Sequence, residues 1–328
     1  MKKYYFSLGE YLILEITGIT FYQLHFNTKA IVKGYENIKP LAERLGVESP
    51  IPRMAGFAYP HIASLGAEII FPENSEPKQV PFIKTPEDID NLKEPDDYLR
   101  APLIRRKLAV WKELKRLCPE TPNSIGHLFE GPVTTAVLLM GESFLTLPYD
   151  DPKRAHKLLS FCTESAIHYA EVITGYFGEK IEPGPKGIPD DFAGMFSPVV
   201  FEEFCIPYWD RLYSELRATE RFLHSELLRK EHLPFLKRVD IKVFDPGADQ
   251  YLTPEILRDY CPCDFTLRIK SWEIDNLSAE ELVEYYRKLQ EYNPVSVNFS
   301  IDFLRQEEKI KKLLDIARKF SVKAVSGK

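Results

Sequence analysis

The chain has 328 residues, of which 43 are Lys or Arg and 49 are Asp or Glu, so its formal net charge is −6. Hydrophobic residues make up 44% of the sequence and aromatic residues 12%, which is enough to bury a full core and excludes a disordered or fibrous chain. Basic residues are interleaved with acidic ones, and this excludes the basic stripe typical of a nucleic-acid-binding protein.

The cysteines and the apolar segments indicate the compartment. Five cysteines are few and odd in number for this length, which favours a reducing compartment over a disulfide framework. The apolar stretch near the N-terminus is interrupted by Glu10 and Glu15, so it predicts neither a signal peptide nor a membrane span. We therefore expect a cytoplasmic protein with no membrane contact.

Strand-like and helical segments alternate after an aromatic-rich leader of about 50 residues. The expected strands are 53–57, 67–71, 124–129, 186–189, 221–225, 241–244, 265–269 and 295–299. The expected helices are 101–117, 153–176, 198–217, 254–260, 282–292 and 302–320. Two of these helices have clear start signals, namely Asp151-Pro152 and the capping box formed by Ser278 and Glu281.

Eight strands alternating with helices predict a single-domain (β/α)8 TIM barrel over residues 51–328, with residues 1–50 as an N-terminal extension that packs on it. In such barrels the chemistry lies at the carboxyl ends of the strands. Polar residues at predicted strand ends include Asp190, Asp191, His224, Glu226, Asp245 and Asn298. Cys261 and Cys263 precede their strand and are expected at the opposite face.

Two segments resemble the uroporphyrinogen decarboxylase superfamily. Residues 126–136 read GHLFEGPVTTA and are followed by Leu139-Met140-Gly141. Residues 190–198 read DDFAGMFSP and are followed by Phe201, Phe204 and Pro207-Tyr208, which is similar to the superfamily signature DD.AG..SP..F..F..PY. Weaker matches at 65–68 and 85–92 keep the family order. The resemblance implies the same barrel fold.

The superfamily implies two activities. It contains uroporphyrinogen decarboxylases, which need no metal, and methyltransferases that move a methyl group between a corrinoid and a thiol with the help of zinc. The decarboxylases carry an arginine-rich stretch on the first strand, whereas residues 52–57 of this chain retain only Arg53. Because each uncompensated buried carboxylate is costly, one arginine serves a polycarboxylated tetrapyrrole poorly. We therefore rank methyl transfer above porphyrinogen decarboxylation.

The methyltransferase branch implies a zinc site formed by a His-x-Cys pair after the fifth strand and a further Cys after the eighth. This chain has His224-Ser225-Glu226 at the first place and Asn298 at the second, so both cysteines are missing. His224 and Glu226 could still bind a metal through nitrogen and oxygen, with Asp245 as third ligand. They could equally serve without metal as an acid-base or binding pair.

Further candidates each have a structural alternative. Asp191 is expected to be catalytic and Asp190 to bind substrate, although either acid could instead cap the helix that follows. His127 and Glu130 flank the end of the third expected strand, where they line the pocket or satisfy one another. Asn298 is a candidate for substrate binding because it replaces the region of a family metal ligand.

Asp245 also precedes Pro246-Gly247, and this sequence is a turn signal that would explain the aspartate without any chemistry.

We therefore expect an enzyme of one-carbon metabolism that exchanges a methyl group between a small molecule and a corrinoid. The corrinoid would come from a partner protein, since this chain has no second domain to hold it. The first alternative is a decarboxylase of a smaller acid, in which Arg53 holds a carboxylate. The second is a barrel that binds a ligand without turnover.

Overall fold

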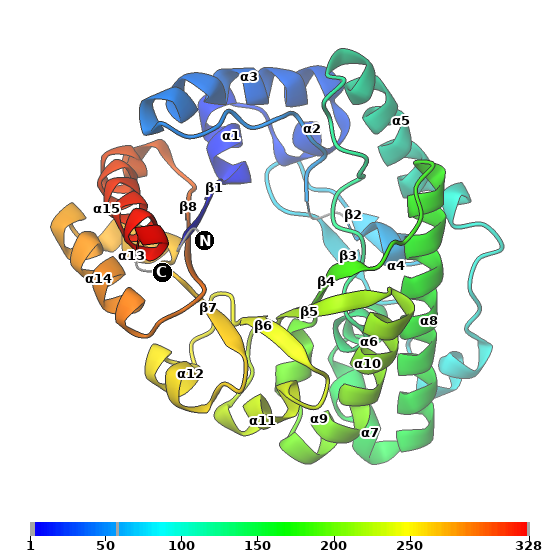
Figure 1. Cartoon of the computed structure of the whole chain (residues 1–328). Coiled ribbons are helices and arrows are strands. Elements are labelled where there is room, and N and C mark those ends of the chain that lie inside the picture. Colours follow the sequence, from blue (N-terminus) through cyan, green and yellow to red (C-terminus); the bar gives the residue numbers. More distant parts are fainter. Residues whose placement is uncertain (1–3, 57–58, 327–328) are drawn as a thin grey trace.

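The structure, a computed structural model, describes residues 4–56 and 59–326. Six strands form one parallel sheet in the order β1-β8-β7-β6-β5-β4, and the sheet curls into an open ring with helices on its outer side (Figure 1). These strands are β1 (Tyr4–Leu8), β4 (Gly184–Pro189), β5 (Ala218–His224), β6 (Ile241–Asp245), β7 (Asp264–Arg268) and β8 (Ser296–Ile301). The predicted parallel α/β architecture is thus confirmed in its main part.

The helices follow the strands around the outside of the ring. Those before β4 are α1 (Glu10–Thr17), α2 (Phe21–Phe26), α3 (Thr28–Leu45), α4 (Pro60–Ser64), α5 (Pro102–Leu117), α6 (Pro132–Met140), α7 (Leu147–Asp150) and α8 (Pro152–Tyr176). Those after β4 are α9 (Pro198–Phe204), α10 (Ile206–Glu215), α11 (Leu233–Leu236), α12 (Pro254–Tyr260), α13 (Ser271–Asn276), α14 (Ala279–Glu291) and α15 (Glu307–Ser326).

The core lies between the strands and this outer layer. In β8 the buried side chains alternate with half-buried ones, so Val297 and Phe299 face the helices while Asn298 lies on the other face. The Phe299 ring contacts Tyr286 of α14 edge-on at a centroid distance of 6.3 Å. Alternation along β8 therefore sends apolar side chains outward to the helices and polar ones into the ring.

Several helices match their sequence signals. Asp151 accepts a hydrogen bond of 3.1 Å from the backbone N–H of Arg154 at the start of α8, and Ser278 and Glu281 form the predicted capping box of α14. The predicted helix 198–217 is interrupted at Cys205 and becomes α9 and α10, because Pro207 cannot donate a backbone hydrogen bond. Among the described residues, no helix is both long and apolar enough to cross a membrane.

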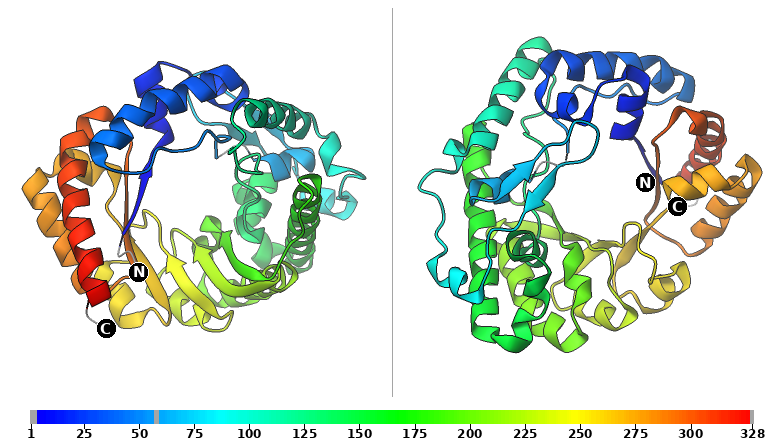
Figure 2. Two further views of the ribbon diagram at one scale, coloured as in Figure 1. Left: turned by 45° about the horizontal axis from the view of Figure 1, so that its top comes forward. Right: turned by 180° about the vertical axis from the view of Figure 1, so that it is seen from behind.

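Three of the eight predicted strands are not strands of this sheet. Residues 52–56 and 124–129 are irregular, while Glu68–Ile70 (β2) pairs antiparallel with Lys78–Val80 (β3) in a separate hairpin (Figure 2). Residue 57 of the first predicted strand lies outside the described residues. The described residues form a curled six-stranded parallel sheet, and a full barrel of eight strands is not confirmed.

Glycine geometry explains why residues 124–129 are irregular. Gly126 has a φ of +111°, which the extended backbone of a strand does not allow, and a Cβ there would lie 2.5 Å from the carbonyl oxygen of Ala55. The segment still joins its neighbours, since the N–H of His127 donates to Gly56 O at 2.8 Å and the N–H of Gly131 donates to Pro189 O at 2.6 Å. The two irregular segments thus continue the wall beside β4.

The first 50 residues also supply part of the sheet. β1 pairs in parallel register with β8 from Tyr4 opposite Val297 to Leu8 opposite Ile301, and the two strands lie side by side in Figures 1 and 2. The helices α1, α2 and α3 follow directly. The predicted N-terminal extension therefore contributes a strand to the sheet itself, although a domain boundary at residue 50 stays a prediction.

Candidate active site

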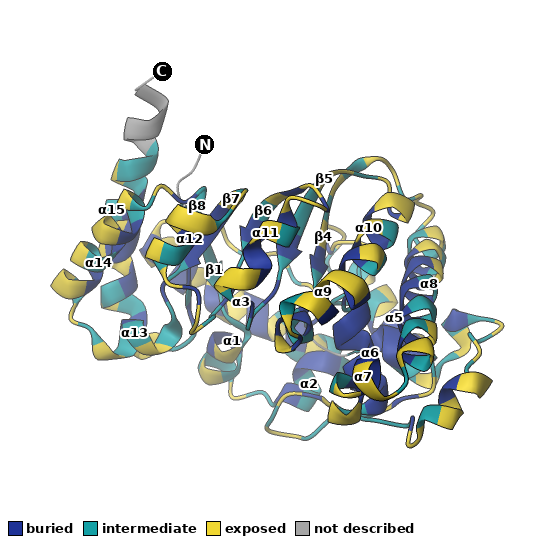
Figure 3. Cartoon of the chain, turned by 90° about the horizontal axis from the view of Figure 1, so that it is seen from below, coloured by how far each residue is buried: buried dark blue, intermediate teal, exposed yellow. Residues whose placement is uncertain are grey.

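The carboxyl ends of the parallel strands meet along one edge of the sheet. We call this edge the mouth and define it by Pro189, His224, Asp245, Arg268 and Ile301, the last residues of β4 to β8. In the side view of Figure 3, α13, which follows β7, and α1, which follows β1, both lie on the lower side of the sheet. The predicted site residues on β5 and β6 therefore lie together at the mouth.

His224 is held by a carboxylate from the neighbouring strand. Its Nδ1 lies 3.1 Å from Asp245 Oδ2, because parallel pairing places His224 opposite Asp245. The Asp245 carboxylate also accepts hydrogen bonds from the Thr266 hydroxyl at 2.7 Å and from the Gly247 N–H at 3.1 Å, and it lies 3.2 Å from the Arg268 guanidinium. This network fixes the orientation of the imidazole ring through Nδ1. The other ring nitrogen, Nε2, therefore faces away from Asp245.

Asp191 lies on the other side of the ring. Its Oδ1 is 3.6 Å from His224 Nε2 and accepts a hydrogen bond of 2.9 Å from the backbone N–H of Glu226. Burial lowers the pKa of His224, but the hydrogen bond and charge of Asp245, with the charge of Asp191, outweigh burial and raise that pKa above its ordinary value. His224 is thus a more basic imidazole than a free histidine.

Burial alone would raise the pKa of Asp245, yet the hydrogen bond to His224 and the charge of Arg268 hold it well below its usual range. Asp245 is therefore ionised throughout the physiological range and stabilises a protonated His224.

Glu226 is fixed by the loop after β6. Its Oε1 accepts a hydrogen bond of 2.8 Å from the backbone N–H of Ala248. A Cβ at Gly247 would collide with Glu226 Oε1 and lie 2.7 Å from His224 Cε1, and Gly247 has a φ of +60°. Only glycine therefore allows this loop to close against both side chains.

Asp190 has a structural position. Its side chain is fully buried, and its carboxylate accepts hydrogen bonds from Trp209 Nε1 at 2.6 Å and from the backbone N–H groups of Thr134 at 2.6 Å and Val133 at 3.2 Å. Thr134 and Val133 belong to the first turn of α6, so Asp190 satisfies the free N–H groups of that helix. Burial raises its pKa to about 6, although these hydrogen bonds oppose the rise.

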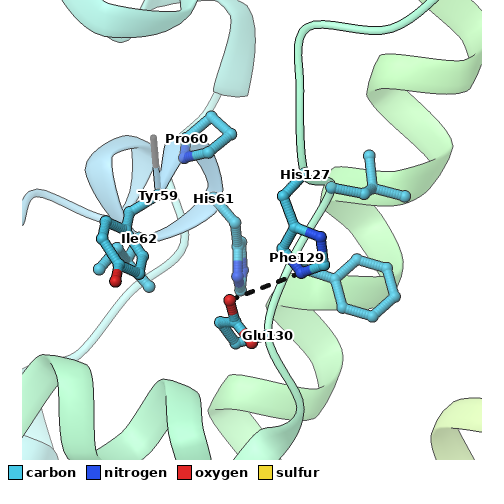
Figure 4. A pocket seen from close by; sticks show the side chains of 8 residues that line it. Tyr59, Pro60, His61, Ile62, His127, Phe129 and Glu130 are labelled. Atoms are coloured by element: carbon cyan, nitrogen blue, oxygen red, sulfur yellow. Dashed lines mark ion pairs between the residues drawn. The ribbon is translucent and has the colours of Figure 1, made fainter. Parts of the chain in front are cut away.

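His127 and Glu130 point toward one another at the edge of a small pocket that is also lined by Tyr59, Pro60, His61 and Ile62 (Figure 4). His127 Nε2 and Glu130 Oε1 are 3.5 Å apart. Burial, with the charges of Asp191 and Asp190, raises the pKa of Glu130 to about 8, and burial lowers the pKa of His127. At neutral pH Glu130 therefore carries a proton beside the ionised carboxylates of the mouth.

The other predicted residues are more dispersed. Asn298 lies on β8 opposite Arg268, where its Oδ1 accepts a hydrogen bond of 2.7 Å from Ser296. Arg53 is exposed, and its charge acts on the buried phenol of Tyr35 in α3. Sequence reasoning missed Arg268, which it placed inside a predicted strand although β7 ends there.

The three side chains of the predicted zinc site are already engaged with other groups. His224, Glu226 and Asp245 come from adjacent strand ends, but the Asp245 carboxylate already faces His224, Thr266 and the Arg268 cation. Among the described residues, no group of three or more His, Cys, Asp or Glu side chains is arranged to hold a metal ion. The arrangement therefore does not fit zinc held by these three side chains, and zinc binding stays a prediction.

Comparisons with known proteins agree with the motifs. Residues 1–255 match the family model described as Uroporphyrinogen decarboxylase (URO-D). Uroporphyrinogen decarboxylase from Myxococcus xanthus (strain DK1622) is 30% identical over 147 residues, a match that covers 42% of this chain and only 39% of that relative.

A solved structure, a methyltransferase from Methanosarcina mazei, superposes with a TM-score of 0.67 and 16% sequence identity over 94% of this chain and 90% of that chain, so the two proteins share a fold. Because the family model spans well over half of the sequence, the resemblance read from the DDFAGMFSP segment is confirmed, and the chain belongs to the uroporphyrinogen decarboxylase family.

Proposed function

We propose that this chain is a methyltransferase in which His224 activates the methyl acceptor at the mouth. The observation that carries the proposal is the position of the imidazole between Asp245 at Nδ1 and Asp191 near Nε2. A histidine oriented by a carboxylate is the usual form of a general base in a protein site. Family membership supports an enzyme, and the shared fold with a methyltransferase is consistent with this choice.

In the proposed reaction an acceptor with an O–H, N–H or S–H group hydrogen-bonds to His224 Nε2. The imidazole takes the proton as the acceptor heteroatom forms its bond to the methyl carbon, and the electron pair of the broken bond stays with the donor. Asp245 and Asp191 then stabilise the imidazolium. The remaining task of the mouth is to hold donor and acceptor in line.

The charge of the mouth supports methyl transfer over porphyrinogen decarboxylation. Asp191, Glu226 and Asp245 are close together, and the Arg268 cation is already paired with Asp245. A substrate with many carboxylates would therefore meet like charge with little cationic compensation. A small neutral or cationic methyl compound would not be repelled by these carboxylates.

We further propose that the methyl group is exchanged with a corrinoid carried by a separate protein, where the corrinoid supplies a cobalt centre that takes up or releases methyl. Exposed apolar side chains follow four of the strand ends and support a partner at this face. They are Tyr11 after β1, Met195 after β4, Tyr251 after β6 and Trp272 after β7, with exposed fractions of 43%, 51%, 41% and 54%.

A second candidate function is decarboxylation of a small acid. Loss of carbon dioxide leaves a carbanion that needs a proton. The Glu130 carboxyl group can supply it, because its pKa is raised to about 8 and it is protonated at neutral pH. The relative named uroporphyrinogen decarboxylase also favours this candidate. In this candidate Arg53 would hold the substrate carboxylate. Ligand binding without turnover is the third candidate.

The test is methyl transfer from methylcobalamin to thiol and tetrahydrofolate acceptors, followed by the visible spectrum of the cobalamin, with and without added zinc. Demethylation is expected in the wild type, and the loss of a general base in His224→Gln should slow it by about 100-fold or more. His168→Gln is the matched control, since His168 is an exposed histidine paired with Glu94.

If folded protein demethylates nothing with any acceptor, or if His224→Gln reacts as fast as His168→Gln, the proposed role of His224 is wrong.

A further inference from the structure

Two thiols lie close together at the edge of the sheet opposite the mouth. Cys261 follows α12 and Cys263 precedes β7, whose other end, Arg268, is at the mouth. The two sulfur atoms are 3.6 Å apart, and both side chains are half-buried. Neither takes part in the site described above.

The local sequence brings the two thiols together. Pro262 has a fixed φ and forces the residue before it into an extended conformation, and Cys261 accordingly has φ −73° and ψ 122°. Residues i and i+2 of an extended segment point to the same side, so the two sulfur atoms face one another across the proline. The other cysteines differ from this pair. Cys162 and Cys205 are fully buried, and Cys118 is a half-buried cysteine at the end of α5.

The pair is chemically unequal. A hydrogen bond from Cys263 lowers the pKa of the Cys261 thiol, although burial opposes this. The same contact, with burial, raises the pKa of Cys263. Because the thiolate is the nucleophile in thiol chemistry, Cys261 is the attacking sulfur and Cys263 is the second, resolving sulfur.

We propose that Cys261 and Cys263 form a reactive dithiol that exchanges with small-molecule disulfides and closes a reversible disulfide. The Cys261 thiolate attacks one sulfur of the small disulfide, and the other sulfur leaves as a thiolate that takes up a proton. Cys263 then loses its proton and attacks Cys261 Sγ, which releases the second small thiol. In sum, the protein dithiol is oxidised, one small disulfide is reduced and two small thiols are formed.

The short loop favours a reversible bond over a structural one. A disulfide across a single residue removes little chain entropy from the unfolded state, so it adds little stability. Short, partly exposed disulfides are also the ones that thiols reduce readily. The proposed site does not depend on the proposed methyl transfer, since it lies at the other end of β7.

The experiment treats the full-length folded protein with oxidised glutathione and measures the mass of its tryptic peptides. Arg258 and Arg268 bound one peptide, residues 259–268, that contains both cysteines. In the wild type this peptide is expected to lose two hydrogen atoms and to regain them with dithiothreitol. Cys263→Ser should stop at a stable glutathione adduct on Cys261, and Cys118→Ser, the control, should behave as the wild type.

A second probe is phenylarsine oxide, which bridges two neighbouring thiols. One equivalent is expected to bind the wild type and Cys118→Ser, and binding should be lost in Cys261→Ser and Cys263→Ser. If peptide 259–268 of the wild type gains only glutathione, or if phenylarsine oxide binds the two single variants as tightly as the wild type, the dithiol is refuted.

Discussion

Lys107 of α5 is a buried cation, and its replacement by methionine is expected to stabilise the protein. Its side chain is fully buried, and among the described residues its Nζ has no hydrogen-bond partner. Burial lowers its pKa from 10.5 to about 7, an effect that the charge of Glu10 offsets only in part. The folded protein therefore holds the charged form at a cost.

The size and the pH dependence of this cost follow from the pKa. A decrease from 10.5 to about 7 is about 3.5 pKa units, and at about 1.4 kcal/mol per unit the protonated form of Lys107 destabilises the fold by roughly 5 kcal/mol. Below pH 7 both states bind the proton and the cost is constant. Between pH 7 and 10.5 only the unfolded chain keeps it, so stability rises by about 1.4 kcal/mol per pH unit.

The assay is urea unfolding of the wild type and Lys107→Met at pH 6, 7.5 and 9. The variant is expected to be more stable by several kcal/mol at pH 6, and the difference should shrink by about 3 kcal/mol between pH 6 and pH 9. Lys112→Met, on an exposed face of the same helix, is the control and should show a small difference that does not change with pH. A difference for Lys107→Met that is independent of pH would refute this reasoning.

Three further predictions concern the mouth. Methyl transfer should increase as the pH rises through the pKa of His224, and Asp245→Asn, which removes the charge that raises this pKa, should move that limb to lower pH and reduce kcat. The pKa of Glu130 is raised to about 8, so the protonated side chain stabilises the fold below its ordinary pKa, and this stabilisation is lost as the pH rises to 8. In urea titrations the free energy of unfolding of Glu130→Gln should therefore decline less over this pH range than that of the wild type. Asp190→Asn turns an amide N–H toward buried donors and should lower the free energy of unfolding by about 2 to 4 kcal/mol, with an unchanged Tm contradicting its role as a helix cap.

The strands that could be predicted are those with a regular apolar pattern. The predicted strands 221–225 and 241–244 fall within β5 and β6 apart from residue 225, because the apolar pattern of these segments is a local property of the sequence. β1 was not predicted, because the five residues Tyr4–Leu8 become a strand only by pairing with β8, almost the whole chain away. The prediction of a strand at 124–129 was wrong, because the positive φ of Gly126 depends on its contact with residues 55 and 56.

The site residues also fall into those that a local pattern predicts and those that depend on distant contacts. His224, Glu226 and Asp245 were predicted because the strand-end rule needs only the position of each strand. The role of Asp190 was not predicted, because the helix that it caps, α6, begins at Pro132 and comes earlier in the chain. The raised pKa of Glu130 arises from burial and from acids on other segments, and a single sequence contains no signal for it.

The pairing of β1 with β8 also determines when the sheet is completed. Tyr4 leaves the ribosome long before its partner Val297, because the whole of the chain between β1 and β8 is made in the interval. Until then the edge of β1 has no strand beside it, and contacts of such long sequence separation form slowly. Closure of the sheet therefore waits for the synthesis of β8, and until then the nascent chain exposes a strand edge that a chaperone can protect.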